Sequence, residues 1–310
     1  MSLALVFPGQ GSQSIGMLAQ LAQTWPQVQE TFEEASQALG YDLWQLTQEG
    51  SPEELNQTDK TQPAMLAAGV AVWRVWLAAG GAQPQYMAGH SLGEYTALVC
   101  SGALDFTDAV KLVQKRGQLM QAAVPEGEGA MAAILGLSDD DVHAVCQEAA
   151  QGDVAQAVNF NSPGQVVIAG TKAAIERALP IAKEKGAKRA LLLPVSVPSH
   201  CDLMKSAAEF LAVELEGIEL GVGNVPVPHN VDVKMHQDAD DIRAALKAQL
   251  HQPVRWVETI ACLADLGVDT VIECGPGKVL AGLNKRINKN MNAMPIFDEP
   301  TLAKALDSIK

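Results

Sequence analysis

The most informative short pattern in the chain is a serine between two glycines, Gly89-His90-Ser91-Leu92-Gly93, which fits G-x-S-x-G. In this pattern the serine occupies a tight turn between a strand and a helix, and N–H groups at the start of the helix face any oxyanion beside it. A short apolar run at 86–88 precedes Ser91, and a helical pattern over 92–100 follows it. The pattern predicts a nucleophilic serine, and the alternative is an ordinary glycine-rich turn.

A nucleophilic serine requires a base, and the chain has six histidines. His200 follows the apolar run 195–198, so we expect it at a strand end facing a cleft, where α/β proteins place catalytic groups. His229 is the competing candidate, and a structural role is the alternative for His200. His90 is expected to pack, because successive residues at a turn point apart. The other three lie among charged or polar residues and are expected at the surface: His143, His236 and His251.

Arg116 is an unusual cation, because it lies in the apolar stripe of the helix predicted over 107–123. One interpretation is an arginine whose stem lies along the apolar surface while its charge reaches water. The other is a buried guanidinium that binds a carboxylate through two parallel hydrogen bonds.

Two further glycine-containing loops are candidates for ligand binding. Residues 7–13, FPGQGSQ, follow a strand predicted over 3–7, but Ser14 replaces the last glycine of a dinucleotide fingerprint. The alternative for this loop is a Gly-Gln-Gly turn that donates a backbone N–H to an oxyanion. Residues 275–278, GPGK, lack the spacing of a phosphate-binding loop and predict a turn before a helix.

The elements that must position these residues alternate between short apolar runs and helical periodicity, which predicts an α/β protein with a mainly parallel sheet. A strand is also predicted at 225–230. The middle of the chain differs, because its predicted order over 130–193 is βαββαβ, as in a ferredoxin-like fold. A glycine-rich entry at 125–129 and Pro194 at the exit indicate that this part is inserted into the larger domain.

The composition is that of an acidic folded chain. Its 310 residues include 36 acidic and 22 basic side chains, a formal net charge of −14, and 48% are hydrophobic. This balance argues against a nucleic-acid-binding surface, and any anionic ligand must meet a local basic patch.

The sequence also predicts a cytoplasmic protein without a membrane segment. The first cationic residue is Lys60, so no charged targeting region is visible. Residues 63–82 have the length and apolar character of a membrane-spanning segment, but their Ala and Gly content and Arg74 favour a buried helix. The five cysteines are scattered without metal-ligand spacing, which suits reduced thiols and predicts no metal site.

Four motifs taken in order, FPGQGSQ at 7–13, GHSLG at 89–93, VPSH at 197–200 and GPGK at 275–278, resemble the malonyl-CoA:acyl carrier protein transacylase family. Residues 159–165, NFNSPGQ, lie between them, so the resemblance covers essentially the whole chain. It implies an α/β-hydrolase-like core, residues 1–126 and 197–310, with a ferredoxin-like subdomain inserted at 127–196. It also implies an acyltransferase that moves a malonyl group to acyl carrier protein for fatty-acid or polyketide elongation.

The resemblance also implies roles for six residues. Ser91 becomes acylated, His200 is the general base, and Arg116 holds the malonyl carboxylate. Gln249 orients the histidine through a carbonyl, of the main chain or of the side chain, and Asp202 is the rival orienter if the resemblance fails. The backbone N–H groups of the oxyanion hole belong to Gln10 and Leu92.

The implied partners are malonyl-CoA and the phosphopantetheine form of acyl carrier protein, and no metal or redox cofactor is needed. The rival functions are a serine esterase or thioesterase, and a scaffold that binds carrier protein without catalysis. Because the carrier proteins are typically acidic, docking requires a basic patch. The first choice is Lys278, Lys285, Arg286 and Lys289, and the second is Lys183, Lys185, Lys188 and Arg189, although each cluster alone suits a solvated helix face.

Overall fold

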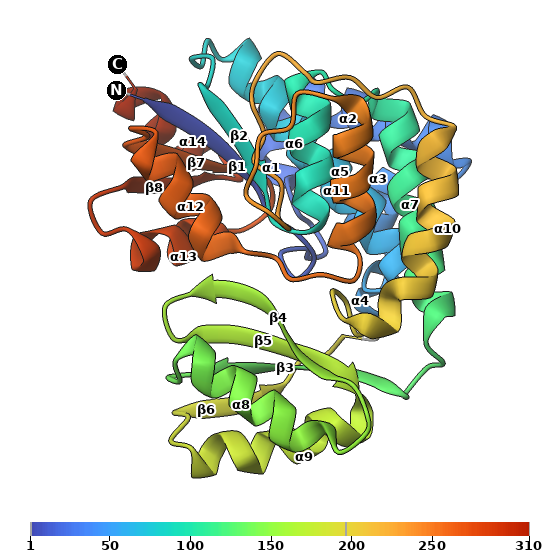
Figure 1. Cartoon of the computed structure of the whole chain (residues 1–310). Coiled ribbons are helices and arrows are strands. Elements are labelled where there is room, and N and C mark those ends of the chain that lie inside the picture. The colour runs from blue at the N-terminus through green and yellow to red at the C-terminus, as the bar shows by residue number, and fades with distance from the viewer. Residues whose placement is uncertain (1, 196, 310) are drawn as a thin grey trace.

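The chain contains two sheets of different kinds (Figure 1), in a computed structural model that describes residues 2–195 and 197–309. The first sheet is parallel, in the order β2 (Tyr86–Gly89), β1 (Leu3–Phe7), β7 (Thr270–Cys274) and β8 (Asn292–Ile296). The second is antiparallel, in the order β4 (Ala155–Ser162), β5 (Gln165–Thr171), β3 (Gly129–Leu135) and β6 (Arg189–Leu192). The predicted α/β class with a mainly parallel sheet is therefore confirmed.

The central strand of the parallel sheet, β1, is buried on both faces, which explains its unbroken apolar sequence. Leu5 and Phe7 belong to one core cluster with the long helix α5 (Thr58–Ala78), and Ala4 and Val6 to another with α12 (Trp256–Asp265). The predicted buried helix at 63–82 thus corresponds to α5. Among the described residues, no helix is long and apolar enough to cross a membrane.

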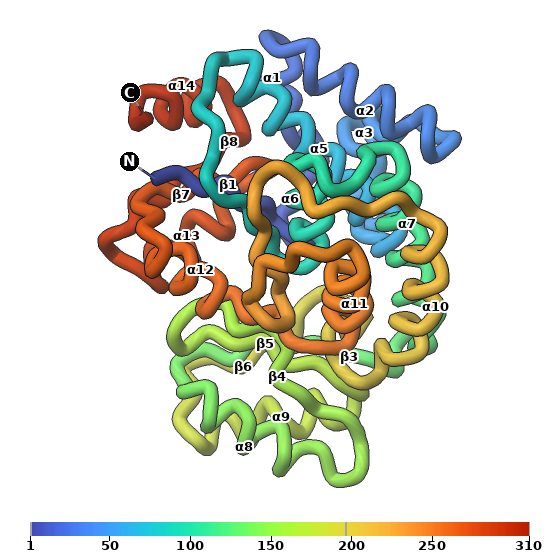
Figure 2. The backbone as a smooth tube through the Cα atoms, turned by 45° about the horizontal axis from the view of Figure 1, so that its top comes forward, coloured from blue at the N-terminus to red at the C-terminus, as the bar shows by residue number. Residues whose placement is uncertain are grey.

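Further helices complete the layers around the parallel sheet. α6 (Leu92–Ser101) follows β2, and α13 (Val279–Ile287) follows β7. Figure 2 shows α10 (Lys205–Glu216) beside α11 (Ala239–Gln249) and α7 (Phe106–Ala123). The remaining elements are α1 (Ala19–Thr24), α2 (Pro26–Leu39), α3 (Leu43–Glu49), α4 (Pro52–Leu55), the 3-10 turn η1 (Asp202–Met204) and α14 (Glu299–Ser308).

The antiparallel sheet follows the predicted order βαββαβ, with α8 (Asp139–Ala150) and α9 (Lys172–Glu184) as its helices. Both helices pack on one face of the sheet, away from the parallel sheet (Figure 1). The opposite face packs on Cys201 of the following loop through Met131 and Val167. The backbone of Val254 also exchanges hydrogen bonds with β4, accepting from Phe160 N at 3.0 Å and donating to Val158 O at 2.8 Å. These contacts fix one sheet against the other.

The strand predicted at 225–230 is wrong, because this segment is irregular in the structure. Pro226 and Pro228 have no N–H group, so two of its residues cannot donate to a ladder. The segment still runs beside β2, since Pro226 O accepts a hydrogen bond from Met87 N at 3.1 Å. Residues 1, 196 and 310, which bound the predicted domains, lie outside the described residues.

Candidate active site

Ser91 occupies the sharp turn between β2 and α6, as G-x-S-x-G predicts. Its φ and ψ are 53° and −112°, a conformation that residues with a side chain adopt rarely. A Cβ atom at Gly89 would lie 1.8 Å from the carbonyl carbon of Gly93, and one at Gly93 would lie 2.0 Å from Phe7 O. Both glycines are therefore required for the close approach of β1, β2 and α6 that presents Ser91.

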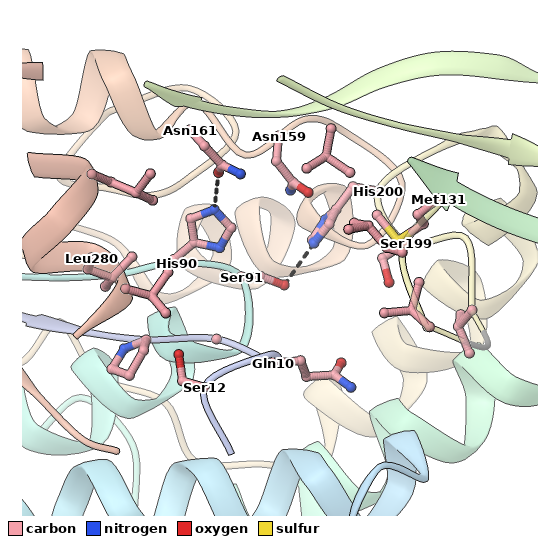
Figure 3. A pocket seen from close by; sticks show the side chains of 18 of the residues that line it. Gln10, Ser12, His90, Ser91, Met131, Asn159, Asn161, Ser199, His200 and Leu280 are labelled. Atoms are coloured by element: carbon pink, nitrogen blue, oxygen red, sulfur yellow. Dashed lines mark hydrogen bonds between the residues drawn. The ribbon is translucent and has the colours of Figure 1, made fainter. Parts of the chain in front are cut away.

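His200 is the histidine that contacts the serine. Its Nε2 lies 2.7 Å from Ser91 Oγ (Figure 3). Its Nδ1 lies 2.6 Å from the carbonyl oxygen of Gln249. Because a carbonyl only accepts hydrogen bonds, Nδ1 carries the proton and Nε2 accepts from the serine hydroxyl. The expected strand end is wrong, since the described residues between β6 and His200 form no strand. The bond from His200 N to Leu250 O, at 3.1 Å, fixes this loop instead.

The environment of His200 favours its neutral form. Burial lowers the pKa of His200 to about 3, and the positive charge of Arg116 acts in the same direction. The side chain is 3% exposed. At neutral pH the imidazole is therefore unprotonated at Nε2, which is the state a general base requires.

The orienting group of His200 is the main-chain carbonyl of Gln249, which answers the question that the sequence left open. The rival Asp202 forms an ion pair with Lys205 at 3.0 Å, on the surface. The competing histidine, His229, is buried, and its Nδ1 lies 2.8 Å from Glu94 Oε1. The geometry thus selects His200 among the candidate bases.

Glu94, in the first turn of α6, is a fully buried carboxylate that the sequence analysis missed. It accepts hydrogen bonds from His229 Nδ1 at 2.8 Å, Asn230 N at 2.8 Å and Gln249 Nε2 at 3.1 Å. These donors compensate for its lost hydration. The sequence feature that could have identified Glu94 is an acidic residue within an otherwise apolar helical run.

Asn230 connects this carboxylate to the serine turn and was also missed. Its Oδ1 accepts from Ser91 N at 2.7 Å, and its Nδ2 donates to Gly89 O at 2.7 Å. The side chain of Gln249 adds a bond from Nε2 to Ser91 O at 2.9 Å. The unusual backbone conformation of Ser91 is therefore held by side chains that are distant in sequence.

Arg116 is fully buried, so the interpretation of a surface-reaching arginine is wrong. Its Nη2 lies 3.5 Å from Ser91 Oγ, at the edge of hydrogen-bond distance. Burial lowers the pKa of Arg116, yet guanidinium stays charged at any ordinary pH. The structure therefore places a buried cation beside the Ser91 hydroxyl.

A pocket of about 210 Å³ opens in front of Ser91 and His200, between the two sheets. Figure 3 shows Asn159 and Asn161 on one side of this cavity, and Gln10 and Ser12 on the other. The apolar lining comes from both halves of the chain: Met131, Val167, Leu193, Val195, Val197, Val279, Leu280 and Leu283.

His90 lines this pocket, which the sequence did not predict. As expected it packs, with its ring centroid 5.6 Å from that of Trp256. It also lines the cavity, and its Nε2 lies 2.7 Å from Asn161 Oδ1. Burial lowers the pKa of His90, so the ring is neutral and donates to the amide oxygen from Nε2.

The loop after β1 brings Gln10 beside the start of α6, where Leu92 is the first residue. The bond from His90 N to Phe7 O, at 3.0 Å, ties this loop to the serine turn. The N–H of Leu92 has no acceptor within its helix, because the first helical N–H groups never do. The two residues predicted for an oxyanion site thus lie on adjacent segments.

The predicted basic clusters are exposed on different parts of the molecule. Lys285 and Arg286 lie on α13, which lines the pocket through Leu280 and Leu283. Arg286 also donates to Gln165 Oε1 at 2.7 Å, across to the antiparallel sheet. Within residues 2–195 and 197–309, no group of three or more His, Cys, Asp or Glu side chains could hold a metal ion.

Residues 4–297 match the model of the acyl transferase domain. The chain is 59% identical to malonyl CoA-acyl carrier protein transacylase of Escherichia coli strain K12, over 98% of both chains. The chain belongs to the malonyl CoA-acyl carrier protein transacylase family. A member from Bacillus subtilis strain 168 is 45% identical, over 99% of this chain and 97% of that one.

Solved structures of this transacylase family share the whole architecture. The transacylase of Coxiella burnetii superposes with a TM-score of 0.98 at 54% identity, covering 99% of this chain and 97% of that chain. A malonyl-transacylase in complex with a type II PKS acyl-carrier protein gives 0.98 at 58% identity, covering 99% and 100%.

Proposed function

We propose that this chain transfers a malonyl group from malonyl-CoA to the phosphopantetheine thiol of an acyl carrier protein, for fatty-acid or polyketide elongation. The observation that carries the proposal is the buried Arg116, whose Nη2 lies 3.5 Å from the hydroxyl that His200 activates. A serine with a base suits acyl transfer, and a cation beside it suits an acyl group that ends in a carboxylate. The names of the relatives support the same reaction.

In the first half-reaction, Nε2 of His200 takes the proton of Ser91 as Oγ attacks the thioester carbonyl carbon. The carbonyl electrons move to the oxygen, and the C–S bond then breaks as the carbonyl re-forms. The thiolate of CoA takes the proton from the imidazolium and leaves as a thiol. The product is a malonyl ester on Ser91.

The second half-reaction reverses these proton transfers with a new thiol. His200 removes the proton of the carrier protein's phosphopantetheine thiol, and the thiolate attacks the malonyl ester. The bond from Ser91 Oγ to the carbonyl carbon breaks, and the imidazolium returns the proton to Oγ. In both halves the N–H groups of Gln10 and Leu92 stabilise the oxyanion.

The domain organisation that accompanies this function is an α/β-hydrolase-like core, residues 1–126 and 197–310, with a ferredoxin-like subdomain at 127–196. The strand order β4-β5-β3-β6 supports the second part of this proposal, because it is the order of a split βαβ fold. The pocket between the two sheets is then a cleft between domains.

The experiment compares malonyl-CoA turnover with and without the phosphopantetheine form of an acyl carrier protein, measuring free CoA, free malonate and malonyl-carrier protein. We expect one burst of CoA without acceptor and sustained turnover with it, and parallel initial-rate plots. Sustained release of malonate at an equal rate without acceptor would identify an esterase or thioesterase. If no CoA is released in either reaction, the chain would instead be a scaffold that binds carrier protein without catalysis.

A further inference from the structure

The guanidinium of Arg116 is buried without a carboxylate partner among the residues that the structure describes. Its side chain is fully enclosed, yet none of the ion pairs formed by these residues includes it. Buried arginines usually pair with a carboxylate, because the lost hydration of the charge is costly. The way in which this charge is held therefore bears on what the site binds.

Two amide oxygens hold the guanidinium instead. Nη1 donates to Gln62 Oε1 at 2.8 Å, and Nη2 donates to Gln249 Oε1 at 2.9 Å. The ring of Tyr95 lies against the group, 5.4 Å from Cζ. These contacts fix the orientation of the cation and leave its full charge uncompensated by a direct anionic partner.

The buried carboxylate of Glu94 does not fill this role, because its hydrogen bonds go elsewhere. Gln249 lies between the two charges, with Oε1 toward Arg116 and Nε2 at 3.1 Å from Glu94 Oε2. An amide offers an acceptor on one side and donors on the other, so it separates the two charges without neutralising either.

Of the two amides that hold Arg116, Gln249 is also hydrogen-bonded to the serine turn, whereas the hydrogen bonds of Gln62 go to other residues. Gln62 lies on α5, is fully buried, and its Nε2 lies 3.4 Å from the sulfur of Met120 and 3.5 Å from Gln10 Oε1. Glutamate has the same length and shape, so a carboxylate at this position would reach Nη1 directly. It would place an anion where the structure has a neutral acceptor.

We infer that Gln62 is a specificity-determining positioning residue, which holds Arg116 in place while keeping its charge available for an acyl donor that carries a free carboxylate. The inference rests on the proposed function. A permanent carboxylate at this position would neutralise the guanidinium and repel the carboxylate of the donor. A neutral residue there would preserve the charge and lose only one hydrogen bond.

The test is the Gln62→Glu variant, with Gln62→Met as a neutral control of similar length. The rate of Ser91 acylation is measured by rapid quenching and mass spectrometry, with malonyl-CoA and with acetyl-CoA, which lacks the free carboxylate. For Gln62→Glu we expect kcat/KM with malonyl-CoA to fall about 100-fold, and acetylation to change by less than about threefold. For Gln62→Met, kcat/KM with malonyl-CoA should fall about tenfold, and malonyl-CoA should remain the preferred donor.

The outcomes separate this inference from the proposed function. Failure of malonyl-CoA to acylate the wild-type protein would contradict the proposed function itself. If the wild type is acylated and Gln62→Glu lowers both donors equally, or keeps its preference for malonyl-CoA, the inference about Gln62 is wrong. Should Gln62→Glu not fold, Gln62→Met decides: a loss confined to malonyl-CoA supports the inference, and a loss of equal size with both donors, or no loss with malonyl-CoA, contradicts it.

Discussion

The two sheets contribute to the pocket in different ways. Segments around the parallel sheet supply the groups that contact the serine hydroxyl, His200 Nε2 at 2.7 Å and Arg116 Nη2 at 3.5 Å. The antiparallel sheet supplies walls, among them Asn159 and Asn161 of β4. Ser91 itself lies on the sharp turn between β2 and α6, whereas the antiparallel sheet presents a face to the pocket. We therefore propose that the segments around the parallel sheet carry the chemistry, and that both sheets shape the pocket.

The largest effect is expected from Ser91 and His200, the proposed catalytic pair of the parallel half. His200→Ala should slow acylation of Ser91 by malonyl-CoA about 1000-fold, because the hydroxyl loses its base. The matched change on the opposite wall, Asn161→Ala, should cost about tenfold, since it removes one hydrogen bond to His90. Rapid-quench mass spectrometry measures both rates. Equal losses would break the proposed division between the halves.

The next effect concerns the choice of acyl donor. Arg116→Ala should lower kcat/KM for malonyl-CoA about 100-fold, because a buried cation that pairs with the donor's carboxylate is lost. Transfer from acetyl-CoA should fall far less, since it has no carboxylate to pair. Steady-state kinetics with both donors measures this split. A loss of the same size with each donor would make Arg116 a structural residue.

A smaller effect is expected where the two halves meet at the surface. Arg286 bonds to Gln165 of β5, and Lys285 is exposed beside it on α13. Reversing both charges, Lys285→Glu with Arg286→Glu, should raise the KM for carrier protein about tenfold and leave acylation by malonyl-CoA unchanged.

The control for this docking prediction reverses two exposed lysines elsewhere, Lys111→Glu with Lys304→Glu, which gives the same change in net charge. Its KM for carrier protein should stay near that of the wild type. Loss of both half-reactions in the α13 variant would indicate binding of the CoA phosphates. An unchanged KM would reject α13 as the docking site.

The last effect is expected on stability alone, without a change in catalysis. Glu273 is buried under the start of α13, where it accepts from Leu280 N at 3.1 Å and Ala281 N at 2.8 Å. Burial raises the pKa of Glu273 from 4.5 to about 7. Between pH 4.5 and about 7 the folded state therefore holds a proton that the unfolded state has released. The stability that this group contributes is lost as pH rises through 7.

The Glu273→Gln variant removes this titration. Between pH 5 and pH 8 the wild type should lose about 2 kcal/mol more of its free energy of unfolding than the variant does. Urea denaturation at the two pH values measures the difference. The same pH dependence in both proteins would show that Glu273 stays ionised.

Local patterns predicted much of the fold. The helical pattern over 92–100 and the strand predicted over 3–7 correspond to α6 and β1, because the apolar periodicity of each segment is a local property of its own sequence. The strand at 225–230 failed because two prolines outweigh its apolar residues. β8 went unpredicted, since its order depends on pairing with β7.

The candidate site was predicted less evenly. Ser91 and Arg116 are marked by turn glycines and by helical spacing, and His200 contacts Ser91 although the described residues between β6 and this histidine form no strand. Asn230 and Gln62 were missed, because each acts on a residue that is distant in sequence. A buried amide has no local signature, so only the folded chain reveals its partner.

The central claim is that malonyl transfer passes through an ester on Ser91. The direct measurement is peptide mapping by mass spectrometry after malonyl-CoA is added to the wild type and to Ser91→Ala without an acceptor thiol. We predict one malonyl group on the wild-type peptide that contains Ser91, and none on the variant. A malonyl group on another residue, such as the adjacent-loop thiol Cys201, or none on the wild type, would contradict the account.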